Sequence, residues 1–247
     1  MLSYQAVASV EAQAVGYSAR AIAALTEVFA EQQLSPRMIS TLSTSGVNQL
    51  LTFSSPDNLS QLILGGRQFE YARSAAIPLG EGLIGFDAFC EEAILVLTQA
   101  LGYVDRTPHR LSTVRDSVLA DLTAKELDTI THTILQRPEI YRDKTIFEWG
   151  WRAVAQIEHT FAERTEPLNT ISTIKRSAIV VAPPPGIDSQ NLGDCINITY
   201  DINSLPDNAQ QRFDKKAIHA FFTRSIEWQA ELEKSVLQFL ETRQTNE

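Results

Sequence analysis

Cysteine is scarce in this chain, which has only Cys90 and Cys195 in 247 residues. Two cysteines so far apart exclude a disulfide framework and favour a reducing compartment. Cys90 falls inside an apolar helical pattern and Cys195 opens a strand-like run, so we expect two buried hydrophobic side chains rather than a nucleophile. The sequence also lacks a signal-peptide layout and any apolar run near the roughly 20 residues that span a bilayer. We therefore expect a cytoplasmic protein that binds no membrane.

Basic charge is scarce as well. The net charge is −9, and no lysine precedes Lys125. Surfaces that bind nucleic acid or anionic lipid are usually basic, so this acidic composition argues against a general binder of either. The 44% hydrophobic and 21% charged fractions are ordinary for a globular protein that is long enough to bury a sizeable core.

Glycine and proline are rare between residues 86 and 166. Apolar residues recur there at three- and four-residue spacing, which is typical of amphipathic helices. We predict helices over 86–101, 108–120, 123–136 and 145–164. The last of these has an apolar stripe made of Phe147, Trp151, Val154, Ile157 and Phe161.

The flanking segments predict a further helix over 4–33 and short helices that open at Ser35 and Ser55. Strands are predicted over 177–182 and 195–202, where apolar and polar residues alternate in the second strand. The chain is thus predicted to be one domain, 1–247, mainly α with a small β element and a multi-helix core. Its parts are helices and irregular loops over 1–85, a helical core over 86–166, a two-stranded β-hairpin over 167–203 and a long C-terminal helix over 204–247.

A glycine-rich string occupies residues 80–85 and reads G-x-G-x-x-G. A dinucleotide-binding loop of this form follows a buried strand, whereas here Pro78 stands next to the turn and Glu81 lies where a phosphate would sit. We interpret the string as a structural loop that leads into a helix. Residues 77–85 also resemble the loop of GAF sensory domains, which implies a ligand sensor built on a sheet; the helical pattern that follows does not supply that sheet.

Motifs for chemistry are few. No G-x-S-x-G nucleophile signature is present, and the four histidines do not have metal-ligand spacing, so we predict no metal site. The densest basic cluster could hold a phosphate, although neighbouring acids favour ordinary ion pairs. Its members are Arg106, His109, Arg110 and Arg115.

One pattern favours an enzyme. Pro206-Asp207 followed by Asp214-Lys215-Lys216 resembles the PD-(D/E)xK nuclease pattern, in which acids hold a divalent metal and a lysine assists the attacking water. A metal-dependent nuclease acting on DNA, with Mg as cofactor and Asp207, Asp214 and Lys216 as catalytic residues, therefore stays open as the alternative.

Two features favour a contact surface. Trp149 lies off the helical stripe, and Pro183, Pro184 and Pro185 stiffen the loop between the predicted strands. Exposed aromatic rings and rigid prolines lose little entropy on binding, although Trp149 would also fit beneath a neighbouring loop. We therefore predict a non-enzymatic, helical interaction or assembly protein without a cofactor, a subunit of a larger complex. Its partner is another protein or a further copy of the chain, and nucleic acid only under the nuclease alternative.

Overall fold

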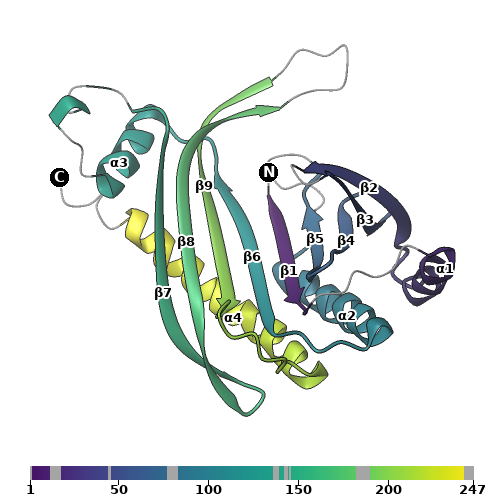
Figure 1. Ribbon diagram of the computed structural model, residues 1–247. Helices are drawn as coiled ribbons and strands as arrows, with labels where there is room; N and C mark the ends of the chain where they lie inside the picture. The colour runs from purple at the N-terminus through teal and green to yellow at the C-terminus, as the bar shows by residue number, and fades with distance from the viewer. Residues whose placement is uncertain are drawn as a thin grey trace.

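The structure of the protein, a computed structural model, describes residues 2–11, 18–43, 46–76, 83–135, 139–141, 144, 146–181 and 190–241. In these residues nine strands form one antiparallel sheet, and four α-helices pack around it (Figure 1). The strands are β1 (Ser3–Ser9), β2 (Ser35–Ser43), β3 (Gly46–Ser54), β4 (Ser60–Leu64), β5 (Gln68–Ser74), β6 (Arg110–Leu119), β7 (Trp149–Phe161), β8 (Arg164–Val181) and β9 (Gln190–Ser204). The helices are α1 (Ala19–Val28), α2 (Phe86–Val104), α3 (Ala124–Ile134) and α4 (Lys215–Glu241), with a 3-10 turn, η1, at Glu139–Tyr141.

The strand order is β2-β3-β4-β5-β1-β6-β9-β8-β7. The first strand of the chain lies at the centre, where β1 pairs with β5 on one side and β6 on the other. Helix α2 packs against β1 and β5, whereas α4 packs against β6, β9 and β7 and also contacts α2. The two edges of the sheet are β2 and β7. No described helix is both long and apolar enough to cross a membrane.

The prediction of a mainly α-helical, two-stranded protein is wrong. Residues 3–9 form a strand before α1 begins, and 110–119 and 149–161, both predicted as helix, are β6 and β7. The short helices expected at Ser35 and Ser55 are a strand start and a turn. The expected two-stranded hairpin is part of the nine-stranded sheet, because β8 pairs with β7 as well as β9. Residues 86–166 are therefore not a helical core.

A two-residue burial period explains the error in β1. Tyr4, Ala6 and Ala8 are buried and the residues between them are half-buried, as in a strand with one face on the core. β9 has the same period, and the strand predicted there is confirmed because Ile196, Ile198, Tyr200 and Ile202 all face the core.

The predicted helical stripe in β7 fails for a different reason. Phe147 is 72% exposed, and Val154 and Ile157 are exposed too, so this three- and four-residue spacing does not mark a core face. The side chains that point to the helices alternate along the strand and include Trp149, Trp151, His159 and Phe161.

Other predictions hold. The helix expected over 86–101 is α2, and the capping box at Thr123 is present, with its hydroxyl accepting from the Glu126 backbone N–H. The C-terminal helix is α4, although it begins at Lys215 rather than directly after Asp207.

Two hydrophobic clusters form the core. The first includes Phe69, Phe89 and Phe221 between the N-terminal strands, α2 and the beginning of α4. The second includes Ile198 and Val236 between β8, β9, α3 and the end of α4.

The β7–β8 hairpin turns through two residues that both have positive φ. Ala162 has φ +48 and Glu163 has φ +65, which defines the type I′ geometry that matches the twist of the strands. Asparagine and glycine adopt these angles at low cost, whereas alanine and glutamate do not. The turn therefore stores backbone strain.

Replacing Ala162 by Asn and Glu163 by Gly relieves that strain. We expect the double variant A162N/E163G to raise the free energy of unfolding by about 1 kcal/mol in urea denaturation. The control K216A removes the exposed ion pair that Glu163 forms with Lys216 at 2.7 Å, which contributes little. A double variant no more stable than the native chain would contradict the strained turn.

Candidate functional site

The three residues of the nuclease pattern do not converge. The carboxylate of Asp214 caps α4 by accepting from the Ala217 N–H at 2.8 Å, and Lys216 pairs with Glu163. Asp207 lies in an exposed turn before the helix. Within the described residues no group of three or more His, Cys, Asp and Glu is placed to hold a metal ion. The pattern thus gains no geometric support for a Mg site.

The cysteines are both buried and reduced. Burial raises the pKa of the Cys90 thiol to about 12 and raises that of Cys195, whose thiol donates to the Ser177 carbonyl at 3.2 Å. Both thiols are protonated near neutral pH, so neither has the thiolate character of a nucleophile.

The basic cluster is divided between the faces of β6. Arg115 points to the helices and pairs with Glu233 of α4 at 2.8 Å. Arg110 lies at a position of opposite parity and donates to the Asn203 side-chain oxygen at 3.1 Å. Opposite parity places the two guanidinium groups on opposite sides of the sheet, so they do not form one phosphate site.

Of the residues in the predicted contact surface, the described part of the chain includes only Trp149. Trp149 is 8% exposed, and its Nε1 donates to Thr131 Oγ1 at 3.0 Å. It offers no exposed surface in this chain, and a binding role for it remains untested. Pro183, Pro184 and Pro185 lie outside the described residues, as do residues 80–82 of the glycine-rich string.

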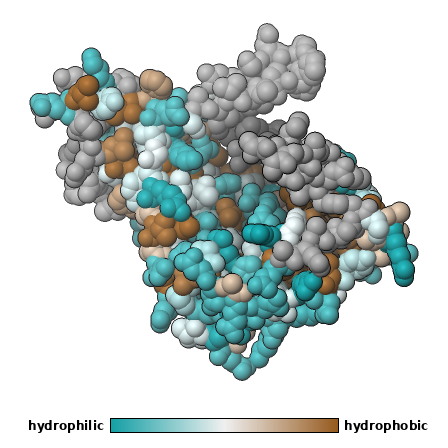
Figure 2. Space-filling model, viewed as in Figure 1, coloured by the Kyte–Doolittle hydropathy of each residue, from teal (hydrophilic) through white to brown (hydrophobic). Residues whose placement is uncertain are grey.

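Exposed hydrophobic side chains instead gather along the β7 side of the molecule. Of eight large exposed hydrophobic residues in the described part of the chain, six belong to this region and two, Leu95 and Tyr103, to α2. In Figure 2 hydrophobic residues are interspersed with hydrophilic ones on the left, where β7 and α3 lie. The six residues, named here the β7 surface, are Ile140, Tyr141, Phe147, Val154, Ile157 and Phe239.

Within the described residues, the backbone of β7 lacks a strand partner along one side. Among the strands that the structure describes, β7 is the last of the sheet and pairs with β8 alone. In an antiparallel strand every second residue points its N–H and C=O away from that neighbour. The 13 residues of β7 present a free edge of roughly 43 Å. None of these residues is a proline, which would block pairing. The free edge of β7 can therefore pair with a further strand.

Helix α4 supports this edge from one face of the sheet. The Trp151 ring stacks on Phe239 with centroids 6.0 Å apart, and the His159 ring lies 4.4 Å from Trp228. Phe161 packs edge-on against Phe221. These contacts span β7 from its third residue to its last, so the strand is fixed on a helix.

Arg176 fixes the beginning of β7. Its buried guanidinium pairs with Asp194 at 2.8 Å and lies 3.7 Å from Asp128 of α3. It also donates to the Ile146 carbonyl at 2.9 Å. One side chain of β8 thus holds β9, α3 and the segment that enters β7.

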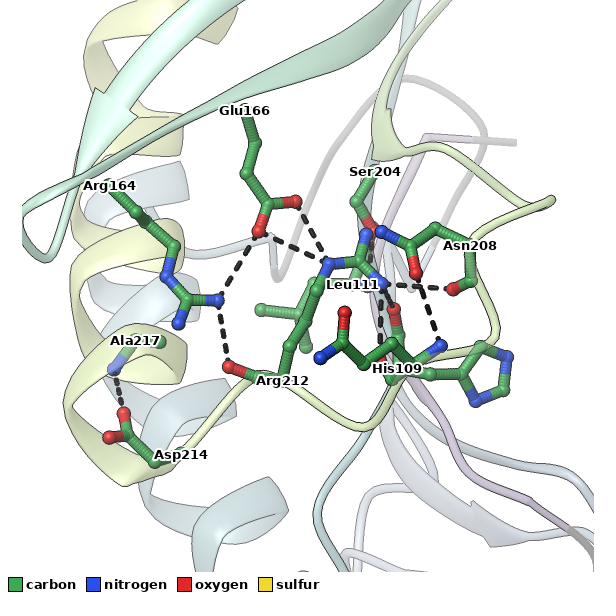
Figure 3. A network of polar contacts seen from close by, with 10 residues as sticks. His109, Leu111, Arg164, Glu166, Ser204, Asn208, Arg212, Asp214 and Ala217 are labelled. Atoms are coloured by element: carbon green, nitrogen blue, oxygen red, sulfur yellow. Dashed lines mark hydrogen bonds and ion pairs between the residues drawn. The ribbon is translucent and has the colours of Figure 1, made fainter.

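Arg212 fixes the other end (Figure 3). Its Nε donates to both carboxylate oxygens of Glu166 at 3.1 Å, and Arg164 donates to one of them at 3.2 Å. The Arg212 guanidinium also donates to the His109 carbonyl and lies 4.5 Å above the Phe213 ring. The network ties the β7–β8 turn to the segment before α4.

The face of the sheet away from α4 is polar. Asp116 accepts hydrogen bonds from Ser3 at 2.6 Å and Thr199 at 2.7 Å. Asp201 accepts from Ser112 and Asn203. Both carboxylates already accept hydrogen bonds from side chains of this chain, so neither is free to act as a general base.

A hollow of about 670 Å³ lies between α1, α2 and the start of α4. Val28, Ile94 and Tyr103 contribute apolar surface to it, and Lys215 and His219 contribute polar atoms. It contains only one of the exposed hydrophobic residues, so the β7 surface is the stronger candidate.

No protein-family model matches this sequence, and no curated protein matches it significantly.

Removing the Arg176 guanidinium tests what positions the entry to β7. We expect R176M to lower the free energy of unfolding by about 1–3 kcal/mol, because buried charge-assisted hydrogen bonds are lost while Asp194 remains partly solvated. Urea denaturation measures it. The control K175M changes an exposed neighbour and should stay within about 0.5 kcal/mol. Equal effects of the two variants would remove Arg176 from this role.

Histidine burial predicts a pH dependence. Desolvation lowers the pKa of His159, packed on Trp228, and desolvation followed by nearby Arg212 lowers that of His109. The unfolded chain then binds protons more readily than the folded chain near the ordinary histidine pKa of about 6.5. The contribution of these two histidines to the free energy of unfolding is therefore present above about pH 6.5. It is lost as the pH falls towards their lowered pKa values in the folded chain.

Chemical denaturation at pH 7.5, 6.5 and 5.5 should therefore show a falling free energy of unfolding. H159F keeps an aromatic ring on Trp228 and removes the titrating group, so its decrease should be smaller. Q156A, at an exposed β7 position, should retain the native pH slope. The same slope in H159F and the native chain would exclude His159 as a contributor.

Proposed function

We propose that this protein is a non-enzymatic interaction and assembly protein that takes up a strand of a protein partner at the β7 edge. The observation that carries this proposal is the coincidence of a long strand with one free edge and six of the eight exposed large hydrophobic residues of the described chain. Monomeric proteins usually protect such edges, so a long edge left free favours pairing with a further strand.

Side-chain placement along β7 fits strand addition. Ile157 faces the helix side, opposite the buried Leu168, and Val154 faces the polar side, opposite Ile171. An added strand would therefore cover one apolar side chain on each face. In this mode main-chain hydrogen bonds give affinity and alternate side chains give specificity.

The edge is also preorganised. Arg176 at one end, Arg212 at the other and α4 beneath hold β7 before any partner arrives. A strand that is already ordered loses little conformational entropy on binding. The reduced, buried cysteines fit a cytoplasmic location, and the net charge of −9 fits a protein partner better than nucleic acid.

Site-specific photo-cross-linking tests the proposal. A benzophenone amino acid at position 154 should form cross-links to another chain in cells that express the protein, because Val154 borders the free edge. The same group at Leu95, an exposed hydrophobic residue of α2, is the matched control. Mass spectrometry of the cross-linked peptide identifies its source. Cross-links at 154 no more frequent than those at 95 would overturn the β7 edge as the binding site.

A further inference from the structure

We infer that the strand taken up at the β7 edge is β7 of a second copy of this chain. The inference rests on the proposed function. The two β7 strands pair antiparallel about a two-fold axis through Ala155, perpendicular to the sheet. The two nine-stranded sheets then form one continuous sheet with both α4 helices on the same side.

The symmetry restricts the register. When a strand pairs antiparallel with its own copy, residue numbers that face each other have a constant sum. Facing side chains share one face of the sheet, so facing residues have the same parity and the axis passes through a residue. Each register is therefore named by the residue on the axis.

Charge complementarity selects one register. Arg152 and Glu158 stand three residues on either side of Ala155, so an axis through Ala155 places each arginine against the glutamate of the other copy. An axis through Arg152 or Glu158 itself would set like charges against each other, which is destabilising. An axis one residue away from Ala155 leaves both charges opposite uncharged residues.

Both charged groups are available for this pairing. Within its own sheet Arg152 stands opposite Thr173, and Glu158 stands opposite Pro167. In the part of the chain that the structure describes, neither side chain makes an ion pair or a hydrogen bond. The second copy supplies to each the partner that its own chain lacks.

The remaining pairs in this register are also compatible. Ala155 faces its own copy, where a small side chain allows close approach. Ala153 faces Ile157 on the helix side, and Trp151 faces His159 beside the aromatic residues of α4. The apolar surface of Ile157 is thus covered by the partner strand, which accounts for its exposure in the single chain.

Charge reversal tests the partner and the register together. In sedimentation or native-mass titrations of the purified chain, the native protein should dimerise with rising concentration. R152E and E158R should each weaken the dimer at least tenfold, because like charges then face each other twice. The double variant R152E/E158R should restore it. The matched control R224E/E227R swaps an exposed ion pair of α4 and should leave the dimer unchanged.

Disulfide trapping tests whether the two-fold axis passes through residue 155. A155C should form an intermolecular disulfide on mild oxidation, because facing Cβ atoms lie about 5 Å apart. A153C should not, because its two copies are about 13 Å apart along the strands. The native thiols are buried and do not compete. A155C trapping with rescue by the double charge swap would support the inference.

Failure of the inference is distinguishable from failure of the proposed function. A purified chain that stays monomeric at all concentrations, or a dimer insensitive to both charge reversals, would overturn self-pairing in this register. Cross-links from position 154 to a different protein would overturn self-pairing while supporting the β7 edge as a binding site. Absence of cross-links at 154 would overturn both.

Discussion

The packing of α4 across the sheet is the interaction on which the rest of the structure depends. The first half of the helix contributes Phe221 and Trp228 to one hydrophobic cluster, and the second half contributes Val236 and Leu240 to the other. Leu232 borders both clusters, so α4 packs against both cores along its length. Because α4 also supports β7 through aromatic contacts, the stability of the edge is coupled to the stability of the interior.

The sequence predicted elements whose signals are local. The capping box at Thr123, the apolar helix α2 and the alternation in β9 are each complete within a short window. The helix prediction for β7 is wrong for two reasons. Apolar residues in this region recur at helical spacing although several of them are exposed, and the turn at Ala162 and Glu163 contains neither asparagine nor glycine. Without a turn signal, a 33-residue hairpin reads as a helix followed by a separate strand.

Local sequence patterns could not predict the candidate site, because it depends on the order of strands in the sheet. Whether a strand lies at an edge depends on which segments pair beside it, and the neighbours of β7 and β8 are set by pairings with β9 and β6 elsewhere in the chain. The prediction that Val154 and Ile157 are core residues is wrong for the same reason, since only the assembled sheet shows that they are 48% and 45% exposed. Conversely, Asp207, Asp214 and Lys216 are close in sequence, yet they form no common site. Asp214 caps α4, and Lys216 forms an ion pair with Glu163.

The opposite edge of the sheet has a different character. Pro36, in β2, has no backbone N–H to donate, and prolines on an outer strand discourage pairing there. A chain whose two edges could both pair would add copies without end and form fibres. If only β7 pairs, and both copies use that same edge, the assembly would close after one addition. In the proposed dimer, the asymmetry between the two outer strands would limit the assembly to a finite size.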